Sequence, residues 1–261
     1  MLVVFLQTSN FGGSSSAKVS NSYFQFRQFT VHQDQCAMKV TTDACLFGAW
    51  VAHHIKNEKK ELSTAFEIGT GTGLLSLMVA QKSELQIDTI EIDNDAFKQA
   101  KENIAMSPWK DRITSFHADV KKFEFKKKYD VIFGNPPFYE NELKSEDSKR
   151  NIALHGSELS FDDVLRLIQY HLSPEGIFFL LLPYKRKDEI RPLFKDHDLD
   201  LLHLTFVRQS VTHDYFRIML KGKIKTKRHS EFYFDEIPVW NEKKQYTEEF
   251  KNLLREYYLY L

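Results

Sequence analysis

Residues 64–73 of the chain read TAFEIGTGTG, and LLSLMVAQK follows them at residues 74–82. Residues 64–68 are mostly apolar and predict a buried strand, whereas the apolar side chains of residues 74–82 recur at helical spacing. Glycine between the two permits a tight turn and lets the backbone come close to a ligand. The stretch therefore predicts a strand, a glycine loop and a helix in direct succession.

Strands and helices are predicted to alternate along most of the remaining chain. Apolar runs mark the strands and helical periodicity marks the helices. The strands are expected at residues 86–92, 112–117, 129–134, 177–182, 199–207 and 215–221, and the helices at 94–106, 161–171, 187–197 and 247–258. This order predicts an α/β fold with a doubly wound, seven-stranded, mostly parallel sheet, whose ligands lie beyond the carboxyl ends of the strands.

Residues that favour helix caps, turns and helix breaks predict further features of the chain. Asn94 is expected to cap the helix that it begins. Residues 173–176, Ser-Pro-Glu-Gly, are expected to form a turn, and Pro192 to break the helix that contains it. Residues 231–234 are expected to add a short edge strand.

Composition bounds the class of protein. The chain has 261 residues, 42% hydrophobic and 28% charged, with a net charge of zero. This balance is ordinary for a globular protein and creates no global field toward nucleic acid or membrane. No apolar run approaches the ~20 residues that span a bilayer. Cys36 and Cys45 match no metal or redox spacing, so we expect a cytoplasmic protein without a metal site.

Local charge differs from the global balance. Basic clusters occur at residues 121–128, 185–187 and 221–228. Each can be a solvated loop, or the clusters can together form one phosphate-binding face.

The glycine loop is preceded by an acidic residue, Glu67. Its spacing over Gly69, Gly71 and Gly73 is G-x-G-x-G, which differs from the G-x-G-x-x-G of nicotinamide dinucleotide sites, and no P-loop lysine follows. A carboxylate here would repel a pyrophosphate but attract the cationic amino acid group of S-adenosylmethionine, which carries no phosphate. The loop therefore favours S-adenosylmethionine as the cofactor over a bare glycine turn.

Acidic residues also end the next two strands. Glu91 is expected to accept hydrogen bonds from the ribose hydroxyls of the cofactor, with Ile92 against its adenine. Asp93 is the fallback for the ribose, although it can equally start the helix that follows. Asp119 is expected to accept from the adenine amine, the alternative being a surface loop acid.

The sequence Asn135-Pro136-Pro137-Phe138 follows the strand at residues 129–134. Two prolines cannot continue a strand, so the chain must leave the sheet as a stiff loop. The Asn135 side-chain oxygen and the Pro136 carbonyl are expected to accept the two hydrogens of a planar amine, and Phe138 to stack on a flipped base. Asn135 is also expected to be among the residues that bind the cofactor. This loop predicts methyl transfer to an exocyclic amine, assisted by orientation and electrostatics rather than by an initial general base.

These motifs resemble those of class I S-adenosylmethionine-dependent methyltransferases of the N-P-P-[YF] branch, which have a Rossmann-like fold. The resemblance runs from about Tyr23 to Lys221. More narrowly, FRQFTVHQD at residues 26–34 and CAMKVTTD at residues 36–43 are similar to the N-terminal signature of the bacterial tRNA1(Val) (adenine(37)-N6)-methyltransferases. The segments Leu143-Lys144-Ser145 and Arg150-Asn151-Ile152-Ala153, with His155, are similar to that group too.

The resemblance implies methylation of N6 of an adenosine beside a tRNA anticodon, adenine 37 of tRNA1(Val), with tRNA as the partner. It also implies that Lys39, Thr41 and Asp43 help to close over the methionine end of the cofactor.

Other functions and the domain organisation stay open at this point. The same loop chemistry serves protein glutamine N5-methyltransferases and other RNA or DNA adenine N6-methyltransferases. A module that docks RNA and uses the cofactor only structurally is a further alternative. We expect a monomer with a disordered leader at residues 1–20, an N-terminal helical extension at residues 21–60 that contributes to closure over cofactor and substrate, and a methyltransferase domain at residues 61–261.

Overall fold

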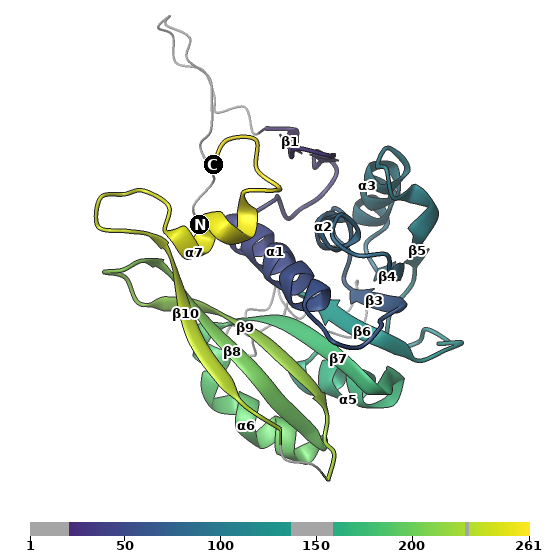
Figure 1. Cartoon of the computed structure of the whole chain (residues 1–261). Coiled ribbons are helices and arrows are strands. Elements are labelled where there is room, and N and C mark those ends of the chain that lie inside the picture. Colours follow the sequence, from purple (N-terminus) through teal and green to yellow (C-terminus); the bar gives the residue numbers. More distant parts are fainter. Residues whose placement is uncertain (1–20, 137–158, 228–229) are drawn as a thin grey trace, which may run out of the picture.

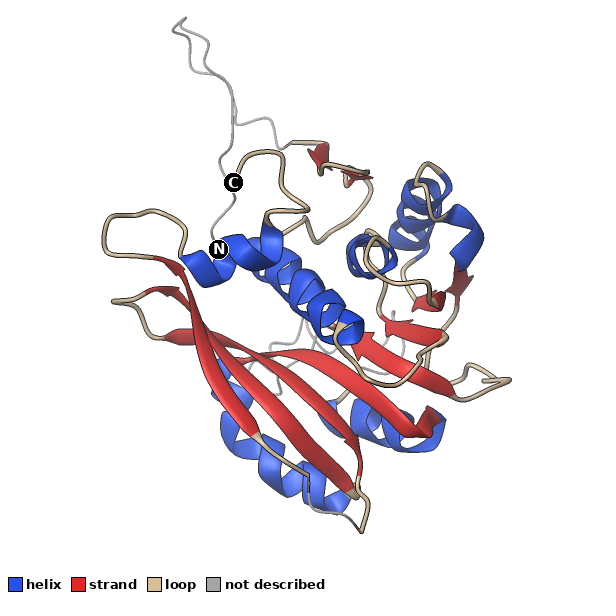
Figure 2. Cartoon of the chain, in the orientation of Figure 1, coloured by secondary structure: helices blue, strands red, loops and turns tan. Residues whose placement is uncertain are grey.

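The computed structural model of the chain describes residues 21–136, 159–227 and 230–261. The predicted leader, and Pro137 and Phe138 of the predicted catalytic loop, lie outside these residues. Figure 1 and Figure 2 show strands and helices in the order expected of an α/β fold, with a sheet between two layers of helices.

An eight-stranded sheet forms the centre of the molecule. Its strand order is β10-β8-β9-β7-β6-β3-β4-β5. Every neighbouring pair is parallel except those that involve β9, which is antiparallel to both β7 and β8. The strands are β3 (Thr64–Ile68), β4 (Gln86–Glu91), β5 (Ile113–His117), β6 (Tyr129–Gly134), β7 (Leu172–Pro183), β8 (Leu199–Ser210), β9 (Tyr215–Ile224) and β10 (Tyr233–Trp240).

Helices cover both faces of the sheet. The first face carries α1 (Thr42–Lys56), α2 (Leu74–Ala80), α3 (Asn94–Ala105) and α7 (Glu248–Leu254), and the second face carries α5 (Phe161–His171) and α6 (Lys187–Asp196), as Figure 1 shows. Alternate residues of the strands point to the two layers, so the apolar core divides into two clusters. Phe133 of β6 belongs to the first cluster and Ile132 to the second.

An antiparallel hairpin of β1 (Tyr23–Gln25) and β2 (Thr30–His32) precedes α1 and lies outside the main sheet. Phe26 and Phe29 in its connection are buried and stack with ring centroids 4.5 Å apart. These aromatic side chains therefore pack in the core rather than offering a surface for stacking.

The main sheet has one strand more than the seven predicted. The expected short edge at residues 231–234 is instead the eight-residue strand β10, which pairs with β8. Ile237 and Val239 are buried on one side of β10, with Pro238 between them. The proline is tolerated because an edge strand needs its N–H groups on one side only.

Two further local predictions are wrong because tertiary packing overrides local preference. Pro192 does not break its helix, since Ile190 and Phe194 are buried on one side of α6 and offset the hydrogen bond that proline cannot make. Residues 173–176 extend β7 instead of forming a turn, and the pairing with β6 shifts register beside Tyr129.

Candidate active site

The carboxyl ends of β3 and β6 meet at the switch point of the sheet, where doubly wound folds bind ligands. Ile68 pairs in register with Gly134, the last residue of β6. A Cβ on Gly134 would lie 2.8 Å from the Ile68 carbonyl oxygen, so only glycine permits this approach. A Cβ on Gly69 would lie 3.9 Å from the Cα of Pro136. The glycine loop and the Asn135-Pro136 segment therefore leave the sheet side by side, with space for little more than one added carbon atom between Gly69 and Pro136.

The glycine loop has a conformation that other residues adopt only with strain. Gly69, Gly71 and Gly73 have φ angles of 75°, 54° and 84°. Each lies in the left-handed region, which costs an L-residue roughly 1–2 kcal/mol. The N–H groups of Gly69 and Thr70 both donate to the Ile90 carbonyl at 3.1 Å, which fastens the loop to the end of β4.

Glu91 lies directly across from this loop. Its Oε2 accepts from the Gly71 N–H at 2.8 Å, and its Oε1 accepts from the N–H groups of Ile92 and Asp93 at 2.9 and 3.0 Å. Three backbone donors thus hold the carboxylate at the rim where a ribose is expected. The Ile92 side chain is exposed beside it, as a residue that packs on an adenine would be.

Asp93 begins α3 rather than serving at the rim. Its Oδ1 accepts from the N–H groups of Asp95 and Ala96 at 3.1 and 2.8 Å, which makes Asp93 the cap of this helix. The prediction that Asn94 is the cap is wrong, because Asp93 has the extended backbone that a cap requires and Asn94 is already helical.

Asp119 follows β5 on the same edge of the sheet. The N–H of the preceding Ala118 donates to the Glu91 carbonyl at 3.0 Å, so the two acids lie at the ends of neighbouring strands. Asp119 Oδ1 accepts from the Lys121 N–H at 2.9 Å and its side chain is largely sheltered. The other carboxylate oxygen of Asp119 lies 3.9 Å from the Lys122 ammonium. These contacts fix the position of the side chain, and its role in binding adenine stays a prediction.

Glu67 is fully buried on β3, directly before the glycine loop. Its Oε2 accepts from the Ser76 hydroxyl of α2, whereas its Oε1 has no hydrogen-bond partner among the described residues. Burial, reinforced by the nearby Glu91 charge, raises the pKa of Glu67 to about 8 despite the Ser76 hydrogen bond. An unpartnered buried carboxyl oxygen fits a cationic ligand group, because such a group would supply the missing hydrogen bond and favour the ionised acid.

The three residues expected to close over the methionine end are held by other partners. Lys39 donates through its ammonium to the Gln33 carbonyl, and Thr41 caps α1 through a bond from the Ala44 N–H at 3.4 Å. Asp43 accepts from Arg217 of β9 at 2.7 Å. Their role in cofactor binding stays a prediction.

One buried side chain that the sequence analysis missed organises this region. Asn103 of α3 donates to the carbonyls of Thr72 and His32, both at 2.8 Å, and accepts from the His32 N–H at 2.9 Å. It thereby ties the glycine loop to the N-terminal hairpin. Gln99 lies four residues earlier on the same face of the helix, is also buried, and accepts a hydrogen bond from the Gln35 N–H at 3.2 Å. Two amide side chains at this spacing were the sequence pattern that could have predicted a polar, buried helix face.

The described part of the chain contains neither a metal-binding cluster nor a membrane-spanning helix. Residues 21–136, 159–227 and 230–261 contain no group of three or more His, Cys, Asp or Glu side chains that could hold a metal ion. Across the same ranges, no helix combines the length and apolar character needed to cross a membrane.

The doubly wound sheet, the glycine loop after β3, the acid after β4 and the Asn-Pro segment after β6 define a class I S-adenosylmethionine-dependent methyltransferase. Known proteins agree with this class. The family model "Methyltransferase small domain" matches residues 49–161. A predicted O-methyltransferase from Agrobacterium tumefaciens superposes with a TM-score of 0.60 at 16% identity, covering 82% of this chain and 96% of that protein.

Sequence relatives narrow the class to one family. A tRNA1(Val) (adenine(37)-N6)-methyltransferase of Dyadobacter fermentans is 50% identical over 164 residues, which are 62% of this chain and 66% of the relative. The protein of the same name from Phocaeicola vulgatus is 37% identical over 239 residues, which are 92% of this chain and 98% of the relative. The chain belongs to the tRNA1(Val) (adenine(37)-N6)-methyltransferase family, and the resemblance inferred from the sequence motifs is confirmed.

Proposed function

We propose that this chain transfers a methyl group from S-adenosylmethionine to N6 of an adenosine in the anticodon-loop region of tRNA, at adenine 37 of tRNA1(Val). The names of its relatives support the substrate. The observation that carries the chemistry is the proximity of the loop expected to hold the methyl donor to the segment expected to hold the acceptor, because Ile68 and Gly134, which precede them, pair in register.

The cofactor side of the site uses residues whose chemistry fits the parts of S-adenosylmethionine. When bound, this molecule supplies an electrophilic methyl group on a sulfonium. Glu67 would pair with its ammonium, Glu91 would accept from its ribose hydroxyls and Asp119 from its adenine amine. The backbone of the glycine loop would come close to it at Gly69, Gly71 and Gly73, because these residues have no Cβ.

The acceptor side uses Asn135 and Pro136. Asn135 is half-buried at the end of β6 and Pro136 is buried against the glycine loop. If Asn135 Oδ1 and the Pro136 carbonyl accept both hydrogens of an adenine amine, the nitrogen is drawn toward tetrahedral geometry and its lone pair is oriented for in-line attack. The amine becomes strongly acidic only as the new bond forms, so orientation supplies most of the rate gain. Phe138 would stack on the base.

Asn135→Ala tests this assignment. We expect methyl transfer from radiolabelled S-adenosylmethionine to tRNA to fall at least a hundredfold, with a much smaller loss of cofactor affinity, because the other residues expected to hold the cofactor are unchanged. Asn252→Ala is a matched control, since Asn252 is exposed on α7. Near-normal turnover by the Asn135 variant would refute the proposed orientation of the acceptor amine by Asn135.

The substrate is tested by mass spectrometry of nucleosides and nuclease fragments of tRNA from cells with and without the gene. We expect N6-methyladenosine to disappear from position 37 of one tRNA. A loss at another nucleotide, or a loss of methylglutamine from a protein with tRNA unchanged, would replace the proposed substrate.

We also propose that the chain acts in the cytoplasm as a monomer. Cys36 and Cys45 are free thiols and do not form a disulfide, as is usual in a reducing compartment. Light scattering should return the 30.7 kDa mass of one chain, and twice that mass would refute the monomer.

A further inference from the structure

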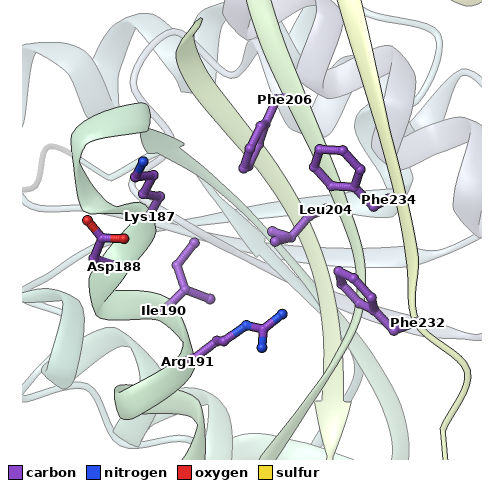
Figure 3. A pocket seen from close by; sticks show the side chains of 8 residues that line it. All are labelled: Lys187, Asp188, Ile190, Arg191, Leu204, Phe206, Phe232 and Phe234. Atoms are coloured by element: carbon purple, nitrogen blue, oxygen red, sulfur yellow. The ribbon is translucent and has the colours of Figure 1, made fainter.

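A groove of about 450 Å³ lies between α6 and the strands β8 and β10, on the second face of the sheet (Figure 3). It does not contain any residue of the candidate active site. Its lining combines aromatic, aliphatic and charged side chains: Lys187, Asp188, Ile190, Arg191, Leu204, Phe206, Phe232 and Phe234.

One wall of the groove is aromatic. Phe232, directly before β10, and Phe234, within it, are 46% and 56% exposed, and Figure 3 shows both side chains among those that line the groove. Phe206 meets Phe234 edge to face, with ring centroids 4.9 Å apart and planes at 87°. Two exposed phenylalanines on one wall keep apolar surface in water, which is characteristic of an interaction site.

The opposite wall is cationic. Lys187 and Arg191 are four residues apart and share one side of α6. Both are exposed, and among the described residues neither makes an ion pair. Asp188 is the single acid in the lining, so two cations face one carboxylate.

We propose that this groove binds a nucleotide of the tRNA outside the methylated position, with its base stacked on Phe232 and Phe234 and its phosphate on Lys187 and Arg191. This inference rests on the proposed function. Aromatic platforms beside cations recognise single-stranded nucleic acid in this way, because every base has a face that stacks and every nucleotide carries a phosphate. The volume of the groove is that of a small-ligand site.

The position of the groove suits a substrate that also reaches Asn135. β8 is separated from β6 by β9 and β7, and three strand spacings of ~4.8 Å amount to roughly 15 Å. α6 begins one 3-10 turn, Tyr184–Arg186, after the carboxyl end of β7, which neighbours β6. A few unstacked nucleotides of an anticodon loop and its flank can span this distance.

Charge disfavours a second copy of the chain as the occupant. A symmetric contact between two such grooves would bring Lys187 and Arg191 of each copy close to the same residues of the other. Like charges at close range oppose that association, whereas phosphate satisfies them.

The test compares tRNA binding by full-length variants in the presence of S-adenosylhomocysteine, measured by fluorescence anisotropy at several salt concentrations. We expect Phe232→Ala and Arg191→Ala each to weaken binding about tenfold, and Phe232→Trp to retain wild-type affinity because it preserves a stacking face. Arg191→Ala should also lower the slope of log K against log salt by about one. Tyr170→Ala and Lys101→Ala are controls, since both residues are exposed on helices away from the groove.

The possible outcomes distinguish a failure of the groove proposal from a failure of the proposed methyl transfer. If Phe232→Ala and Arg191→Ala both bind tRNA within twofold of wild type, with unchanged melting temperatures, the groove does not hold RNA. If wild type is a dimer that Phe232→Ala dissociates, the groove is a protein contact and the proposal is overturned. If wild type binds tRNA but leaves it unmethylated, the proposed function fails while the variants still decide the groove.

Discussion

Glu67→Gln should separate the stability of the protein from its affinity for the cofactor. Glu67 is fully buried with one unpartnered oxygen, and its pKa is raised to about 8. With that pKa the carboxyl is about 90% protonated at pH 7 and about half protonated at pH 8. An ammonium that binds beside it favours the ionised form, so cofactor binding should release about 0.9 proton at pH 7 and about 0.5 at pH 8.

The same pKa fixes the sign of the effect on stability. A carboxyl whose pKa is raised on folding stabilises the folded state below its ordinary pKa, and that contribution is lost as the pH rises toward 8. Each pH unit above the ordinary pKa of 4.5 lowers the free energy of unfolding by about 1.4 kcal/mol, so the decrease amounts to roughly 3 kcal/mol at pH 7. Glutamine does not ionise, so Glu67→Gln should raise the free energy of unfolding of the cofactor-free protein by about 2–4 kcal/mol at pH 7.

Binding should change in the opposite direction. A hydrogen bond to a charged group contributes about 1.5–3 kcal/mol, so S-adenosylhomocysteine, which carries the same ammonium, should bind the Glu67 variant ten- to hundredfold more weakly. Titration calorimetry at pH 7 in two buffers of different ionisation enthalpy measures both the affinity and the released proton. Ser76→Ala is the control, because it removes a hydrogen bond that lowers the pKa and should leave the proton release near one.

Two results would refute this reasoning. Proton release that persists in Glu67→Gln would assign the proton to another group. A Glu67→Gln protein that is less stable at pH 7 than wild type would mean that Glu67 is ionised and already paired in the cofactor-free state.

Two further predictions concern the scaffold of the site. Gly69→Ala should lower the free energy of unfolding by about 1–2 kcal/mol, because its φ of 75° is strained for alanine, and should weaken cofactor binding; equal stability and affinity in thermal and binding assays would contradict the described loop. Asn103→Ala should lower the free energy of unfolding by about 2–4 kcal/mol and expose the N–H of His32 to hydrogen exchange, since three hydrogen bonds of a buried side chain are lost; unchanged protection of His32 would contradict the link to the hairpin.

The features that were predicted best from the sequence are those that depend on a few consecutive residues. The glycine loop after β3 and the proline segment after β6 each follow from a few consecutive residues, and both lie where the alternation of elements placed them. The details that failed depend on distant partners. Pro192 continues a helix because Ile190 and Phe194 are buried, and Pro238 lies in a strand because β10 is at an edge.

Charge runs illustrate the same limit. The basic run at residues 121–128 does not act as an uncompensated patch, because Lys127 contacts Asp88 at 2.9 Å and Lys126 contacts Glu124 at 2.8 Å. Lys221, in the run at residues 221–228, pairs with Glu58, 163 residues away in the sequence. In contrast, the cations of the groove lie on α6, and the aromatic side chains that they face lie on β8 and at the start of β10. These segments are separated in the sequence, so no local pattern predicts that they form one groove.

The places where the chain departs from ordinary folding rules also identify what it binds. Glu67 is a buried acid with an unpartnered oxygen, which destabilises the cofactor-free protein, and it lies beside three glycines whose left-handed backbone would strain any other residue. Two other residues, Asp198 and Lys244, have a positive φ, but both are exposed outside helices and strands, where such strain is common. A buried acid that lacks a hydrogen bond is expected at an edge where a bound ligand supplies the missing partner. The same argument applies to Phe232 and the exposed ring beside it, because a groove that keeps two aromatic rings in water is compensated only when it is occupied.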